Sequence, residues 1–155
     1  MTESRVLIVD VYVLRPAGGG VEVLCLRRAP GQRSGGSWET VHGHVQDGEH
    51  PVDAAVRELR EETGFTAVRL YNVSRVESFY PHRRDVVALI PAFCAVVPPG
   101  AAAVVSVEHD RAEWLPPEEA ARRFAWPRER RALADALALL PGGDAGLLDD
   151  VLRVR

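Results

Sequence analysis

Three glutamates near the middle of the chain have a spacing that can gather a divalent cation. Glu58, Glu61 and Glu62 lie at mutual offsets that bring their carboxylates to one side of an α-helix, within about a third of its circumference. Like charges at such offsets repel each other, so a positive partner is expected. Arg57, four residues before Glu61, can pair with it. One guanidinium does not balance three carboxylates, which leaves room for a metal ion.

The carboxylate oxygens of these glutamates favour Mg²⁺, or Mn²⁺ in its place, over Zn²⁺. Magnesium usually keeps several waters and completes its shell with substrate phosphates. A metal-bound water can attack phosphorus, and the metal can neutralise charge that develops on the phosphates. The spacing therefore indicates phosphoryl chemistry. For three acids alone, a solvated helix face rich in glutamate is the alternative interpretation.

A helix over residues 52–63 is predicted to carry these acids. Val52, Ala55, Val56 and Leu59 recur at helical spacing and form an apolar stripe next to them. Gly64 is a typical C-terminal stop. We expect the helix to dock on the core through the stripe and to present all three carboxylates along its edge.

Strands dominate the first two-thirds of the chain, and helices close it. Extended runs rich in β-branched and aliphatic residues predict strands over 5–14, 21–26, 38–41, 68–79 and 86–97, and a last strand that ends at Leu115. Pro16 and the glycines at 18–20 predict the first hairpin turn, and Arg27 is expected to begin a loop. Helices are predicted over 118–124 and 128–140, followed by a short helix or a frayed tail. This order predicts one α/β (α+β) domain over residues 1–155, with a mixed β-sheet flanked by helices on both faces.

The composition is that of an ordinary globular domain. The chain has 155 residues, 46% hydrophobic and 26% charged, with a formal net charge of −3. Such a balance supplies no positive field for a nucleic-acid polymer, and no apolar run is long enough to span a membrane. Cys25 and Cys94 lie in apolar runs and are expected to be buried free thiols. Residues 1–5 lack a signal-peptide pattern, so a cytoplasmic location is expected.

A longer motif surrounds the three glutamates. Residues 43–65 read GHVQDGEHPVDAAVRELREETGF. This segment resembles the Nudix box at each of its defining positions, which here are Gly43, Glu49, Arg57, Glu58, Leu59, Glu61, Glu62, Gly64 and Phe65. The motif also has the context that it needs: a strand, a glycine turn, an acidic helix and a glycine stop.

The resemblance to the Nudix family implies both a fold and a reaction. The implied fold is an α/β/α sandwich, and the implied reaction is hydrolysis of a nucleoside diphosphate linked to a further group. The three glutamates would then bind the metal, together with the backbone carbonyl of His42. Arg57 would orient the glutamates, and Glu49, Gly43 and Gly64 would support the motif. The general base varies within the family, and is either a box glutamate or an acid of a later loop.

Glu108 is the best later acid. The pairs around it, Glu108-His109 and Glu113-Trp114, resemble a segment of several nucleotide-cleaving Nudix proteins, although a surface-loop acid is the alternative. Residues 37–45 and the tail from Ala125 resemble a subgroup that includes dATP and dihydroneopterin triphosphate pyrophosphohydrolases.

Substrate contacts are expected from side chains outside the box. Arg27 occupies a position where Nudix proteins often place a substrate-contacting arginine, and either Arg27 or Arg28 can touch a phosphate. Phe79, Tyr80 and Trp126 can stack on a nucleobase. Arg83 and Arg84 can form a basic rim. A solvated loop or ordinary packing is the alternative for each of these residues.

The leading hypothesis is a Mg²⁺-dependent pyrophosphohydrolase that cleaves a (d)NTP or modified nucleotide to a nucleoside monophosphate and pyrophosphate. Hydrolysis of dinucleoside polyphosphates or NDP-sugars is one alternative. A non-catalytic nucleotide-binding module is another, although such modules commonly lose box glutamates. A small nucleotide is the expected partner, and the sequence leaves a homodimer open.

Overall fold

The central strand of the fold is β2 (Ile8–Ala17), which is buried over most of its length because its residues are almost all apolar. The computed structural model describes residues 1–66 and 68–155. On one edge β2 pairs in parallel with β7 (Val86–Val96). It also pairs antiparallel with β5 (Val41–His44) through its first half and with β3 (Gly20–Arg28) through its second half. Because β3 and β5 pair with different halves of β2, the sheet is open beside β5.

The remaining strands extend this mixed sheet. Strand β1 (Glu3–Val6) runs parallel to the start of β7, and β6 (Arg69–Phe79) pairs antiparallel with β7. Strands β4 (Trp38–Glu39) and β8 (His109–Leu115) both pair antiparallel with β3. The register of β8 shifts at the end of β3, between Arg27 and Arg28.

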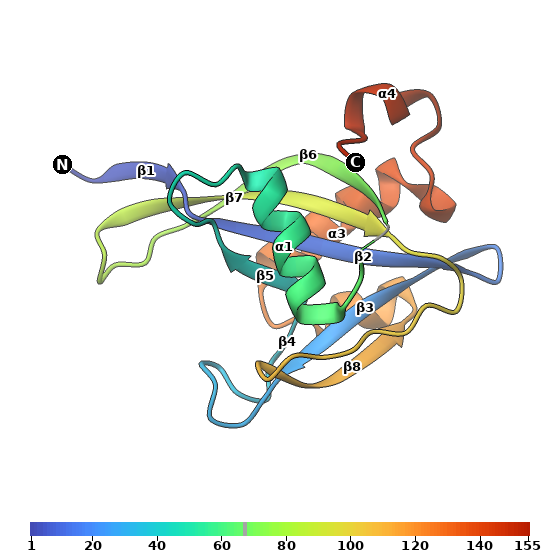
Figure 1. The fold of residues 1–155 in the computed structure, drawn as a ribbon, viewed down its shortest axis with the longest axis horizontal. Helices are drawn as coiled ribbons and strands as arrows, with labels where there is room; N and C mark the ends of the chain where they lie inside the picture. The colour runs from blue at the N-terminus through green and yellow to red at the C-terminus, as the bar shows by residue number, and fades with distance from the viewer. Residues whose placement is uncertain (67) are drawn as a thin grey trace.

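Helices cover both faces of the sheet, as the sequence predicts (Figure 1). Helix α1 (Pro51–Thr63) packs through Ala54, Ala55 and Leu59 on one face. Helices α2 (Pro117–Arg123) and α3 (Pro127–Leu139) pack on the other face, against a core that includes Tyr12 and Leu14. The alternation of side chains along β2 supplies both cores, because successive residues point to opposite faces. The predicted α/β/α layering is confirmed.

The structure corrects two predicted boundaries. Strand β2 continues through Pro16, which pairs with Val21, so the hairpin turn consists of Gly18 and Gly19 alone. Both glycines have positive φ, which a glycine adopts without strain. Strand β3 continues to Arg28, so the prediction that Arg27 begins a loop is wrong.

The end of the chain is docked, not frayed. Two 3₁₀ turns (Pro141–Gly143 and Gly146–Leu148) lead into the short helix α4 (Asp149–Leu152). The Val154 N–H then donates to the Leu70 carbonyl over 2.8 Å. The Leu70 N–H donates in turn to the Arg155 carbonyl over 3.1 Å, and these two bonds tie the last residues to the start of β6.

Two expectations about apolar segments can be compared with the structure. Cys25 and Cys94 are buried free thiols, as predicted. Over the described residues, no helix has the length and apolar character that crossing a bilayer would require.

Candidate active site

A cavity of about 810 Å³ opens beside β5. Its wall includes Glu58 of α1, Glu108 from the segment before β8, and Trp126 at the start of α3. The loops β3–β4 and β6–β7 contribute basic side chains to the same wall. The cavity therefore brings part of the acidic helix together with cationic and aromatic groups that lie far from it in sequence.

Local sequence features place α1 against β5. Pro51 occupies the first turn, where a missing N–H costs nothing, and Gly64 ends the helix with φ of 79°. The Gly64 N–H donates to the Arg60 carbonyl over 2.9 Å. A Cβ added to Gly43 would lie 1.9 Å from Glu58 Cδ, so only glycine lets this carboxylate rest on the strand.

Arg57 ties the helix to the loop before it. Its Nε and Nη2 donate to the two Glu49 oxygens at 2.8 and 2.9 Å, and Nη2 also donates to the His44 carbonyl at 2.8 Å. Its Nη1 lies 2.6 Å from Glu58 and 3.3 Å from Glu61. The hydrogen bond from Arg57, with one from the Gln46 N–H, lowers the pKa of Glu49 to about 2. Arg57 thus neutralises part of the negative charge of the glutamates and holds the loop that precedes α1 in place.

Glu62 differs sharply from Glu61. The Glu61 side chain is 52% exposed, whereas Glu62 is 2% exposed and neither of its carboxylate oxygens has a hydrogen-bond partner. Burial, reinforced by three nearby carboxylates, raises the pKa of Glu62 to about 10; these neighbours are Glu39, Glu58 and Glu108. The expectation of three acids along one exposed edge is therefore wrong for Glu62. A step of one residue turns the helix by about 100°, so Glu62 faces the sheet and Glu61 faces solvent.

The acids fit a hard divalent cation. The two carboxylate oxygens of Glu62 are buried without a hydrogen-bond partner. The charge of Glu58 lies close enough to raise the pKa of Glu62. Across residues 1–66 and 68–155, no three His, Cys, Asp or Glu side chains converge as a ready-made metal centre. The donors are nevertheless all oxygens, the type that Mg²⁺ and Mn²⁺ prefer. Burial and donor chemistry together favour these residues as cation ligands.

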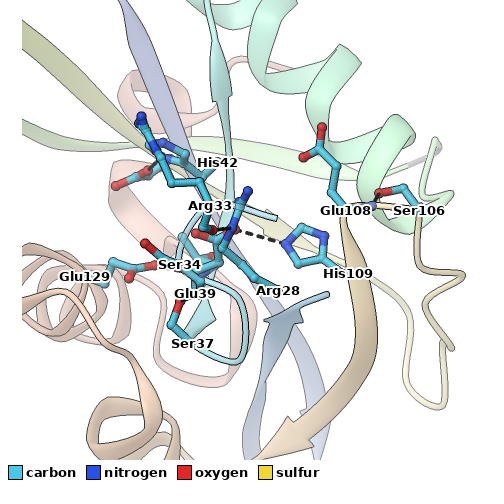
Figure 2. Close-up of polar contacts among 12 residues, drawn as sticks. Arg28, Arg33, Ser34, Ser37, Glu39, His42, Ser106, Glu108, His109 and Glu129 are labelled. Carbon is cyan, nitrogen blue, oxygen red and sulfur yellow. Dashed lines mark hydrogen bonds and ion pairs between the residues drawn. The ribbon is translucent and has the colours of Figure 1, made fainter. Parts of the chain in front are cut away.

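Glu108 belongs to the cavity wall. Figure 2 shows its carboxylate turned toward α1 and away from the side chains of Glu39 and His109. Its charge contributes to the raised pKa values of both Glu58 and Glu62, after the larger effect of burial. The sequence-predicted later acid and two box glutamates therefore lie in one electrostatic neighbourhood.

A buried polar cluster under Glu108 was not predicted. Glu39 is 4% exposed and its Oε1 lies 3.0 Å from His109 Nε2 and 2.8 Å from Arg28 Nη1 (Figure 2). Burial opposes its charge, but His109, His42 and Arg28 keep the pKa of Glu39 below its ordinary value. Because His109 follows Glu108, this cluster anchors the base of the segment that carries Glu108. The sequence signal for this cluster was a glutamate within the predicted short extended segment 38–41.

A second unpredicted cluster joins the start of α3 to β5. Asp10 is 1% exposed, and its carboxylate lies 2.7 Å from His42 Nδ1 and accepts from Arg128 Nε at 3.0 Å. Glu129 is fully buried and accepts the Thr40 N–H at 2.7 Å. These contacts hold the strand that carries the His42 carbonyl. Their members come from separate elements, and no motif marks them in the sequence.

The structure does not bring Arg27 into the cavity wall. Arg27 donates to Asp110 through Nε at 2.8 Å and Nη2 at 2.9 Å, whereas its neighbour Arg28 lines the cavity. Alternation along β3 places Arg27 on the face of Val23 and Cys25, and Arg28 on the opposite face with Leu24 and Leu26. The predicted strand ended at Leu26, so the prediction did not extend this alternation to either arginine.

Some of the candidate aromatic side chains line the cavity and one does not. Trp126 lines the cavity together with Phe79, and their ring centroids lie 6.4 Å apart in an edge-to-face arrangement. Tyr80 lies outside the wall, and its hydroxyl donates to Asp85 over 2.7 Å. Of the three expected aromatic residues, Phe79 and Trp126 therefore face the cavity and Tyr80 does not.

Similarity to known proteins extends over most of the sequence. The sequence matches the NUDIX domain family over residues 4–136. It is 32% identical over 137 residues to an octanoyltransferase of Myxococcus xanthus, which covers 84% of this chain and 36% of that protein. It is 33% identical over 102 residues to the mouse asymmetrical bis(5'-nucleosyl)-tetraphosphatase, which covers 64% of this chain and 67% of that protein. The chain thus spans about a third of the first relative's length.

A solved structure shows the same fold. The dihydroneopterin triphosphate pyrophosphohydrolase of E. coli superimposes with a TM-score of 0.70 at 24% identity, over 86% of this chain and 95% of that one. The family match covers most of the sequence, and the glutamate motif lies on the helix and glycine turns that it requires. The chain therefore belongs to the NUDIX domain family.

Proposed function

We propose that this protein hydrolyses a phosphoanhydride bond of a nucleoside triphosphate or modified nucleotide, releasing a nucleoside monophosphate and pyrophosphate. The cavity beside β5 carries the proposal, because it joins three kinds of group. Glu58 and Glu108 form its acidic side, arginines line its mouth, and Phe79 and Trp126 offer aromatic faces. A polyphosphate needs cations, and a nucleobase suits an aromatic surface.

The proposed cofactor is Mg²⁺, which Mn²⁺ can replace. Glu58, Glu61 and Glu62 would hold it, with the backbone carbonyl of His42. When bound, a divalent cation neutralises charge on the phosphates and makes a water more acidic. The two unpartnered oxygens of Glu62 support this assignment.

Side chains of the protein orient the metal ligands and accept the proton from water. Arg57 orients Glu58 and Glu61 through the contacts described above. We assign the general base to Glu108, whose carboxylate accepts a proton from the attacking water. The water oxygen forms a bond to phosphorus, and the bridging oxygen leaves with its electron pair on pyrophosphate. Trp126 with Phe79 holds the base.

A dinucleoside polyphosphate is a second candidate substrate. The identity to the mouse bis(5'-nucleosyl)-tetraphosphatase favours it, since that relative is matched over two-thirds of its own length. The chemistry at phosphorus would be the same, and only the leaving group would differ.

A nucleotide panel tests the proposal. Purified protein is incubated with dNTPs, diadenosine tetraphosphate, NDP-sugars and ADP-ribose, in Mg²⁺ and in EDTA, and products are identified by mass spectrometry. We expect Mg²⁺-dependent release of a monophosphate and pyrophosphate from a dNTP. Binding of nucleotides without product from any of them would contradict hydrolysis and would favour a binding module.

A further inference from the structure

Three arginines of the cavity wall have no acidic partner within the described part of the chain. They are Arg33 of the β3–β4 loop and Arg83 and Arg84 of the β6–β7 loop. The other arginines of the wall are paired, namely Arg28 with Glu39, Arg57 with Glu49 and Arg128 with Asp10. Their charges are therefore used within the protein, whereas those of the first three remain available to a ligand.

Within the described residues, the acid of the β6–β7 loop forms no ion pair with the arginines of that loop. Asp85 is the single acid of the segment 81–85, and it accepts the Tyr80 hydroxyl at 2.7 Å and the Thr2 hydroxyl at 2.9 Å. The Arg84 N–H donates to the Pro81 carbonyl at 2.8 Å, which closes the turn. Two hydroxyl donors thus engage the carboxylate, and Arg83 and Arg84 stay unpaired.

The two arginine-bearing loops lie at the same end of the sheet (Figure 1). Both loops contribute to the wall of the same cavity, which His44 of β5 also lines. Guanidinium groups from loops distant in sequence therefore face one cavity.

We propose that Arg33, Arg83 and Arg84 form an anion subsite that binds phosphates beyond the two that flank the cleaved bond. The proposal rests on the hydrolysis proposed above and narrows its substrate to chains of three or more phosphates. Three unpaired guanidiniums attract a tri- or tetraphosphate more strongly than a diphosphate-linked sugar, which carries fewer charges. The net charge of −3 makes this cluster a local feature of the surface.

Binding without metal tests the subsite independently of catalysis. Inorganic tripolyphosphate is titrated into the protein in EDTA and followed by calorimetry. We expect the double variant Arg83→Gln with Arg84→Gln to weaken binding by about tenfold or more, and Arg33→Gln to weaken it from the other loop. The charge-matched control is Arg60→Gln with Arg122→Gln, because both residues are exposed and lie outside the cavity wall. Equal affinities for both double variants would overturn the subsite.

Steady-state kinetics supply the second test. For dATP and for diadenosine tetraphosphate, the double variant should raise KM by about tenfold and change kcat by less than about threefold. The substrate with the larger change identifies the source of the polyphosphate. The KM for ADP-ribose should not change, and an equal rise for ADP-ribose would overturn the proposal. Arginine-dependent tripolyphosphate binding by a protein that hydrolyses no nucleotide would refute the proposed function alone.

Discussion

The carboxylate of Glu58 rests on the backbone of Gly43, so closely that a Cβ at position 43 would lie 1.9 Å from Glu58 Cδ. Gly43 is not among the glycines with positive φ, so its backbone does not require glycine. The requirement is steric, since the far end of the Glu58 side chain occupies the space of a Cβ. The missing methyl group therefore sets the position of the Glu58 carboxylate against the strand that carries His42.

Gly43→Ala should displace Glu58 and lower hydrolysis. We expect a larger effect on turnover than on the free energy of unfolding, because an added methyl would meet only the far end of the flexible Glu58 side chain and would displace its carboxylate. Denaturant unfolding and Mg²⁺-dependent turnover measure the two effects. Gly20→Ala is the matched control, since a Cβ there would meet only the Ala17 carbonyl at 3.9 Å. Wild-type stability and turnover in Gly43→Ala would contradict this interpretation.

Glu62→Gln should separate activity from folding. Turnover is expected to fall by about 100-fold or more, because a cation ligand is lost. In EDTA the variant should unfold at a temperature equal to or above that of the wild type, since a buried, unpartnered carboxylate is removed. Mg²⁺ should raise the Tm of the wild type more than that of the variant. Glu118→Gln, in the first turn of α2, is the control, and near-normal turnover in Glu62→Gln would refute the metal assignment.

Glu129→Gln should stabilise the protein increasingly as pH rises. Burial, followed by the charge of Asp10, holds the pKa of Glu129 well above its ordinary value of 4.5. Above pH 4.5 the unfolded chain releases this proton while the folded chain retains it, so wild-type stability falls as pH increases. The variant lacks this titration. Its advantage in unfolding free energy should be smallest near pH 4.5 and larger at pH 7, and a pH-independent difference would argue against it.

Glu77→Gln should show the opposite pH dependence. Burial opposes the charge of Glu77, but hydrogen bonds from Arg131 at 3.1 Å and Arg75 at 2.6 Å hold its pKa below 4.5. The folded state thus favours the carboxylate, and its contribution to stability is present above pH 4.5 and lost as pH falls through the lowered pKa. We expect the variant to be about 1 kcal/mol less stable at pH 7, with the gap closing in acid. Chemical unfolding at several pH values measures it.

Trp126→Ala should weaken nucleotide binding. Loss of a stacking face costs about 1–3 kcal/mol per base, so KM should rise by about tenfold or more with a smaller change in kcat. Leu147→Ala removes a fully exposed apolar side chain outside the cavity wall and serves as the control. An unchanged KM in Trp126→Ala would exclude the aromatic pair as the base-binding surface.

Features that depend on local spacing could be predicted from the sequence. The period of the apolar residues predicts α1 to within one residue of its observed start, and Gly64 ends it as expected. The alternation of strands and helices predicts the layers, because burial of one face per element leaves few arrangements. The glutamate motif identifies the family for the same reason, since its residues lie within one short segment.

Tertiary structure alone decided which side chains face the cavity. The docking of α1 buries Glu62 and leaves Glu61 in solvent, although both are adjacent in sequence. Pairing with β8 extends β3 to Arg28, and alternation along the strand turns Arg28 toward the cavity and Arg27 away from it. Arg33 and Arg84 line the same cavity because two loops reach the same end of the sheet. Such choices depend on contacts between segments far apart in the chain, and a periodic pattern within one segment carries no information about them.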